Sequence, residues 1–238
     1  QSIGVTASNW DTSWVASTVG AVSTVAGSCD LGGCHPAIAS PSGIAIDASG
    51  RVYVAGPAEP SGSAVYSLDR QSRVLHLLAG SGVTGAADGV GGEASFGSLW
   101  GDTIAIGSDG YLYIADRQNH RLRRVDVDTG QVTTVAGSSA GFADGPGSQA
   151  QFANPHSIGA DRSGHIYVAD DSHKVRIYDI AAGTVTSLSV TGTQWSFATA
   201  LDVGSDGRLY WLNNNLYVLD LASGVSSLFA VGFFEPAM

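Results

Sequence analysis

Short apolar runs, some continuous and some alternating with polar residues, recur along the chain between clusters of turn-forming residues. The stretch 101–137 shows this most clearly, because three predicted turns divide it, at 108–110, 117–120 and 128–130. The runs between these turns are rich in Ile, Val, Tyr and Leu, which is typical of half-buried strands. The pattern predicts strands at 103–107, 111–115, 122–127 and 131–136, joined as a four-stranded antiparallel meander. A lone meander has two open edges and a small core, so we expect it to pack against similar units.

Three further copies of this unit appear when the sequence is aligned on the glycine of the first turn. The four aligned glycines are Gly50, Gly110, Gly164 and Gly207, so successive copies are 60, 54 and 43 residues apart. The final strands also match, at 22–27, 74–80, 132–137 and 185–188. Repeats of this length, each forming four strands, are typical of the blades of a β-propeller.

Several segments of the repeat form a recognisable sequence pattern. It combines PSGIAIDASGRVYVA (41–55), ADRQNHRLRRVD (115–126) and TGQVTTVAG (129–137). This combination resembles the NHL-repeat β-propeller family, which is named after an Asn-His-Leu signature. The signature reads Asn119-His120-Arg121-Leu122 here and Ser172-His173-Lys174-Val175 in the next copy. The resemblance covers nearly the whole chain, and it implies a propeller fold with protein interaction as the commonest use.

The two ends of the chain are offset from the repeat. Residues 13–27 align with the third and fourth strands of a blade, and 233–238 resemble 152–157, which lead into a first strand. A ring completed from both termini would remove the exposed edges of an open propeller, with 3–7 and 228–234 as the available strands. We therefore predict one all-β domain over 1–238, a propeller of five four-stranded antiparallel blades, four complete and one composite. Six blades are the alternative if the chain is a fragment, since six-bladed rings are common in the NHL family.

Charge narrows the range of partners. The formal net charge is −10 with a single lysine, and such a surface repels a phosphate backbone, so nucleic-acid binding is disfavoured. No run approaches eighteen apolar residues, so we expect no membrane insertion. Arg121, Arg123 and Arg124 form the one dense basic cluster. We interpret it as a solvated blade edge whose charges discourage edge-to-edge pairing.

Two cysteines lie five positions apart, Cys29 and Cys34, with two glycines between them that let the chain turn back. A disulfide is sterically reasonable there and predicts an oxidising compartment, hence a secreted or extracellular protein. A metal site with His35 is the alternative, although a fourth ligand is missing and the spacing fits no common zinc signature.

Two related loops, 87–96 and 143–152, separate the blades. Each begins with an Asp-Gly pair, typical of a turn with positive φ, and ends in an aromatic residue, Phe96 or Phe152, that we expect between adjacent blades. Other aspartates are interpreted as turn residues. They are Asp47, Asp109, Asp161 and Asp206 in the first turns, where calcium ligation is the less favoured alternative, and Asp116 and Asp170 at the ends of second strands. We expect Asp116 and Asp170 to accept backbone hydrogen bonds from the turn that follows each of them.

Equivalent positions in each blade should meet around the central channel. The residue eight positions before each turn glycine is Ser42, Asp102, His156 or Thr199, at the entrance of the innermost strand. Trp100 and Trp195 lie just before first strands and could offer a sugar-stacking face, with packing between blades as the favoured interpretation.

Channel chemistry can be judged from the same positions. Peptidyl-hydroxyglycine lyases, which are similar propellers, hold a metal with channel histidines, and Pro155-His156-Ser157 resembles one of those motifs. Ser42, Asp102 and Thr199 stand where further histidines would be, which leaves too few ligands for zinc or calcium. A hydrogen-bonded pair of His156 and Asp102 that caps the channel is favoured over a metal site, and no cofactor is expected.

These observations predict an extracellular, non-catalytic binding or assembly propeller that presents its inter-blade loops to a protein or glycan partner. Two alternatives stay open. One is a metal-dependent lyase or hydrolase with its site at the channel mouth. The other is a structural repeat unit of a larger extracellular fibre or coat.

Overall fold

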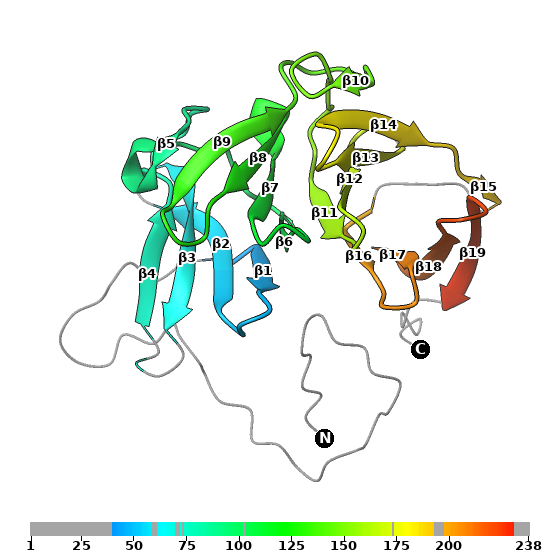
Figure 1. The fold of residues 1–238 in the computed structure, drawn as a ribbon, viewed down its shortest axis with the longest axis horizontal. Helices are drawn as coiled ribbons and strands as arrows, with labels where there is room; N and C mark the ends of the chain where they lie inside the picture. The colour runs from blue at the N-terminus through cyan, green and yellow to red at the C-terminus, as the bar shows by residue number, and fades with distance from the viewer. Residues whose placement is uncertain are drawn as a thin grey trace, which may run out of the picture.

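The computed structural model describes residues 40–230, apart from 59–60, 70–71, 73, 102, 173 and 193–197. These residues form four sheets, each built on an antiparallel meander and each a predicted blade, that follow one another around a central axis (Figure 1). The first blade contains β1 (Gly43–Ile46), β2 (Val52–Ala58), β3 (Gly62–Asp69) and β4 (Val74–Ala79). The second contains β6 (Ile104–Ile106), β7 (Leu112–Asp116), β8 (Arg121–Val125) and β9 (Gln131–Ala136).

The remaining blades repeat this order. The third contains β11 (Ser157–Ala160), β12 (His165–Ala169), β13 (Val175–Asp179) and β14 (Thr184–Leu188). The fourth contains β16 (Ala200–Val203), β17 (Arg208–Asn213), β18 (Asn215–Asp220) and β19 (Val225–Ala230). The predicted propeller with four-stranded meanders is confirmed, and the four strands proposed around Gly110 lie within two residues of the observed ones.

The inter-blade loops add a short outer strand to three blades. These strands are β5 (Gly89–Val90), β10 (Gly145–Pro146) and β15 (Thr191–Gly192). β5 and β10 pair antiparallel with β9 and β14, whereas β15 pairs parallel with β19. Two short 3-10 helices, η1 (Gly91–Glu93) and η2 (Arg117–Asn119), complete the described elements.

The composite fifth blade concerns residues that mostly lie outside the described part of the chain, namely 1–39 and 231–238. One detail of that prediction is wrong. Leu228, Phe229 and Ala230 do not begin a new strand, because they form the end of β19, paired with β18 as the outer strand of the fourth blade. A single domain over 1–238 stays a prediction.

The core lies between blades. Tyr53 and Val65 of the first blade share one buried cluster with Ile104 and Leu112 of the second, and Phe96 is buried among them. Phe152 occupies the same place in the cluster between the second and third blades. Both aromatic residues are fully buried, as expected for side chains that plug the junction of two blades.

Each first turn is closed by its aspartate. Asp47, Asp109, Asp161 and Asp206 each accept a backbone N–H from their own turn. Each carboxylate also accepts the hydroxyl of a second-strand tyrosine, at 2.8 to 3.0 Å, from Tyr53, Tyr113, Tyr167 and Tyr210. The structural interpretation of these aspartates is therefore confirmed, and the tyrosine contact explains why the turn and the following strand recur together. No helix in the described part of the chain is both long and apolar enough to cross a membrane.

Candidate functional site at the channel mouth and the inter-blade loops

Three of the four predicted channel-mouth residues are described, and they share one position in their blades. Ser42, His156 and Thr199 each precede the innermost strand and donate their backbone N–H to the second strand, at 2.8 to 3.0 Å. The inner strands β1, β6, β11 and β16 contact one another in that order, so these residues lie on one rim. Asp102 and Trp195 lie outside the described residues.

The hydroxyl groups on this rim are used structurally. Ser42 donates its hydroxyl to the carbonyl of Leu99, with the carbonyl of Ala55 3.3 Å away, and Thr199 donates to the carbonyl of Leu212. Neither hydroxyl has a neighbouring base in these contacts that would activate it as a nucleophile.

His156 is buried, and its Nδ1 lies 3.0 Å from the carbonyl oxygen of Asn154. That contact requires a proton on Nδ1. Burial lowers the pKa of His156, although the Asn154 carbonyl and the nearby Asp171, 3.7 Å away, act in the opposite direction. The imidazole is therefore neutral at physiological pH. Among the described residues, no group of three or more metal-ligating side chains is found.

The turn at 117–120, which carries part of the NHL-type signature, contacts the segment that precedes His156. His120 adopts the left-handed conformation, with φ of 56°, and its Nδ1 accepts the backbone N–H of Asn154 at 3.1 Å. Asn154 is also left-handed and donates its side-chain amide to Asp171. The turn of the second blade thus positions the segment that carries His156 of the third blade.

The position of Trp100 contradicts the favoured interpretation that it packs between blades. Its side chain is 59% exposed, so it does not pack between blades. It lies just before the innermost strand of the second blade and offers an aromatic face to solvent.

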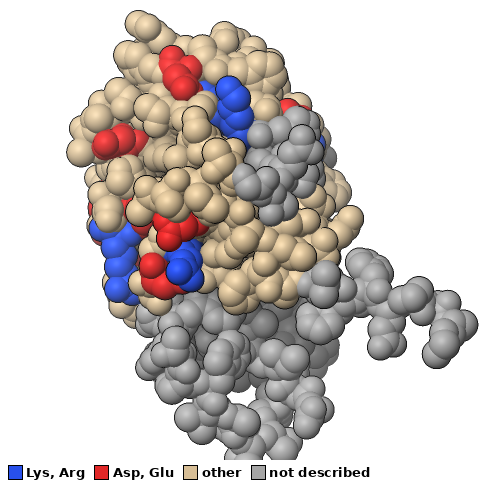
Figure 2. Space-filling model, turned by 90° about the vertical axis from the view of Figure 1, so that its right-hand side faces the viewer, with Lys and Arg blue, Asp and Glu red and all other residues tan. Residues whose placement is uncertain are grey.

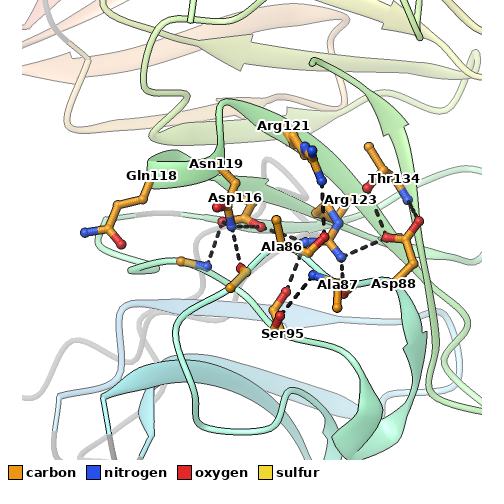
Figure 3. A network of polar contacts seen from close by, with 12 residues as sticks. Ala86, Ala87, Asp88, Ser95, Asp116, Gln118, Asn119, Arg121, Arg123 and Thr134 are labelled. Atoms are coloured by element: carbon orange, nitrogen blue, oxygen red, sulfur yellow. Dashed lines mark hydrogen bonds and ion pairs between the residues drawn. The ribbon is translucent and has the colours of Figure 1, made fainter. Parts of the chain in front are cut away.

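A buried arginine fixes the first inter-blade loop, as Figure 3 shows. The guanidinium of Arg123 lies between two carboxylates, 2.8 Å from Asp116 and 2.8 Å from Asp88. It also donates to the carbonyls of Ser95 and Ala87, at 3.1 and 2.7 Å. Two loop carbonyls and one loop carboxylate are thereby tied to strand β8, and the cation sits 5.2 Å from the centre of the Phe96 ring.

Asp88 and Asp116 complete this arrangement. Burial acts to raise the pKa of Asp88, but hydrogen bonds from Thr134 and the ion pair with Arg123 outweigh it, so the pKa lies below its ordinary value. Asp116 is fully buried and accepts the backbone N–H of Gly97 and the amide of Asn119. The expected contact of Asp116 with the backbone of its own following turn is replaced by these partners.

The third blade repeats the clamp. Arg176 is fully buried, 3.3 Å from Asp170 and 2.7 Å from Asp144, and donates to the carbonyls of Gln151 and Ala143. Its cation lies 5.2 Å from the Phe152 ring. Asp170 also accepts the backbone N–H of Ser172, so here the predicted contact with the following turn is confirmed.

The interpretation of Arg121, Arg123 and Arg124 as a solvated edge is wrong for its central member. Arg123 is fully buried, and Arg121 and Arg124 are half-buried, the latter over the ring of Tyr111. The sequence carries a signal that marks the residues of the clamp, although not their burial or their pairing. An aspartate at the end of the second strand, an arginine on the third and an Asp-Gly in the preceding loop recur together in two copies.

Known proteins carry the same repeat. Over 182 residues the chain is 30% identical to the protein SUPPRESSOR OF QUENCHING 1, chloroplastic, of Arabidopsis thaliana, a match that covers 69% of this chain and 17% of that protein. It is also 38% identical over 68 residues to NHL repeat-containing protein 2 of Gallus gallus, covering 29% of this chain and 9% of that protein. The human NHL repeat-containing protein 2 is 27% identical over 50% of this chain and 15% of its own length.

The chain is an NHL-repeat β-propeller. Its blades, its repeat sequence and these relatives agree. No family profile matches the chain. The NHL propeller described here spans less than a fifth of each of these three relatives.

Solved structures share the fold of this NHL propeller. A nidogen/laminin complex contains a chain with a TM-score of 0.55 and 16% identity, covering 79% of this chain and 62% of that one. Virginiamycin B lyase from Staphylococcus aureus has a TM-score of 0.53 and 14% identity, covering 82% of this chain and 56% of that one. At these identities the likeness concerns the fold alone, which hosts both protein binding and enzymatic activity in such neighbours.

Proposed function

We propose that this NHL propeller is a protein-binding scaffold that presents its inter-blade loops, 80–96 and 137–152, to a partner. The observation that carries the proposal is the clamp repeated in two blades. Arg123 and Arg176 each hold a loop through two backbone carbonyls and one aspartate. A loop that is already ordered loses little conformational entropy on binding, so its contacts contribute more fully to affinity.

Apolar side chains are exposed on these loops. Val83 and Val90 in the first loop and Phe142 in the second are about half exposed, as is Trp100 just before β6. Aromatic side chains on a rigid surface are common anchors of protein interfaces. The loops therefore combine a fixed backbone with exposed apolar side chains, which suits binding better than it suits a solvated connection.

Removing the side chain of Phe142 tests the proposal. Phe142 is 59% exposed, and Phe229 on β19 has the same exposure outside these loops, so it supplies a matched control. Purified wild type, Phe142→Ser and Phe229→Ser would be immobilised and exposed to protein extract from the source, with bound proteins quantified by mass spectrometry. We expect a protein bound by wild type and Phe229→Ser to be depleted about tenfold with Phe142→Ser, the loss of roughly 1.4 kcal/mol. Equal binding to all three baits would refute the role of the loops.

An extracellular location and a role in a larger assembly extend this proposal. They rest on Cys29 and Cys34, which lie outside the described residues. A disulfide between them predicts an intact mass about 2 Da lower before reduction than after it. An unchanged mass would remove the argument for an oxidising compartment.

A further inference from the structure

The two clamped loops differ at the residue that precedes the clamped alanine carbonyl. In the loop before the second blade this residue is Ala86, whose own carbonyl accepts a hydrogen bond from Arg121 Nη1 at 3.1 Å. In the loop before the third blade it is Phe142, which precedes Ala143. The Phe142 side chain is 59% exposed, so an apolar group stands where the other loop has a small side chain.

The residue of the third blade that faces this position also differs. Lys174 corresponds to Arg121, because each lies two residues before the clamping arginine of its blade. Residues two apart on an extended chain point to the same side, so Lys174 points, like Arg176, toward the loop that contains Phe142. Because Arg121 reaches the residue equivalent to Phe142 in the second blade, we place the Lys174 side chain beside Phe142.

Lys174 is an available cation. It is exposed, and within the described part of the chain its ammonium group makes no hydrogen bond or ion pair. The carboxylates close to it already have partners, since Asp144 and Asp170 are paired with Arg176 and Asp171 accepts a side-chain amide. Charged groups are sparse on the surface of this molecule, and Figure 2 shows one face that is largely uncharged. A cation without a carboxylate partner, beside an exposed aromatic ring, therefore distinguishes this loop.

We propose that Phe142 and Lys174 together select the partner, and that this partner is a protein segment with an acidic side chain next to an aromatic or aliphatic one. The inference rests on the proposed binding role of the inter-blade loops and adds the chemistry of the segment bound there. Phe142 supplies the apolar contact, and the Lys174 ammonium supplies a charge-assisted hydrogen bond to a carboxylate.

The rest of the molecule limits how acidic this segment is. The net charge of −10 repels a long acidic tract, so a single carboxylate beside an apolar side chain fits the site better. The equivalent position of the second blade lacks both features, because Ala86 is small and Arg121 is already bonded to its carbonyl. Selectivity therefore belongs to the loop at 137–152.

Selection from a phage-displayed library of random peptides, with purified wild type as bait, identifies the preferred sequence. We expect the selected peptides to be enriched in Asp or Glu next to an aromatic or aliphatic residue. Fluorescence anisotropy then measures the affinity of one selected peptide. Lys174→Gln should weaken its binding about tenfold, as expected for the loss of one hydrogen bond to a charged group. Replacing the acidic residue of the peptide with its amide should weaken binding to wild type by the same factor and cause no further loss with Lys174→Gln.

Arg121→Gln is the matched control, because it removes a cation at the same position of the second blade, and it should leave the affinity unchanged. Peptides that need Phe142 but show no preference for an acidic residue would overturn the role of Lys174 and leave the proposed binding role intact. Peptides whose binding survives Phe142→Ser would contradict both. Equal losses in Lys174→Gln and Arg121→Gln, or a library that yields no specific peptide, would also overturn the selection by Phe142 and Lys174.

Discussion

Arg123 and Arg176 each bury a guanidinium completely, an arrangement that costs several kcal/mol of desolvation before any contact is counted. The cost is offset by two carboxylates and two loop carbonyls around each cation. Because these partners come from the end of the second strand and from the inter-blade loop, each arginine fixes its loop in one arrangement. We expect the main effect of the clamp to be on the geometry of the loop, because a buried ion pair by itself often adds little net stability.

Replacing Arg123 with methionine should destabilise the protein by roughly 3–5 kcal/mol, because Asp116 would keep a buried charge without its partner. Urea unfolding at neutral pH measures this loss. Arg124→Met is the control, since Arg124 is half-buried over the Tyr111 ring and should cost only about 0.5–1 kcal/mol. Equal losses in the two variants would contradict the clamp.

The burial of His156 predicts that the stability of the protein depends on pH. Burial lowers its pKa in the folded state, whereas the unfolded chain has a histidine pKa of about 6.5. Between these two values the unfolded chain binds more protons, so stability falls as the pH drops below about 7 and levels off below the folded pKa. In His156→Asn, whose amide can donate to the Asn154 carbonyl in place of Nδ1, this part of the dependence should disappear. Urea midpoints at about pH 7.5 and about pH 5, on either side of 6.5, measure it. If wild type and variant lose the same stability between these two pH values, His156 is not the group responsible for the pH dependence.

At the scale of elements, the blades differ at their outer edges although their inner strands are alike. Each of the four meanders keeps its first turn through an aspartate and a tyrosine hydroxyl. Only the second and third blades add the arginine clamp in the described structure, and their edges are closed. In the fourth blade Tyr217 takes the place of the clamping arginine and stacks on Trp211.

At the scale of the whole molecule, the propeller separates two roles. Junctions between blades are filled by buried aromatic and aliphatic side chains, which hold the blades in fixed relation. The loops between blades carry exposed apolar groups on clamped backbone. Substitution of Phe142 should therefore weaken the proposed partner binding without disturbing the junctions between blades.

The sequence by itself determined the blades, their order and their turns. Alternating apolar residues and turn glycines act through contacts close along the chain, and four copies of the same pattern made the repeat visible. The placement of His156, Ser42 and Thr199 on one rim followed from the same periodicity. Only the tertiary structure showed that Arg123 is buried, because its partner Asp88 lies 35 residues away and alternation assigns no partner to a charge. For the same reason the exposure of Trp100 became visible only once neighbouring blades and loops were in place.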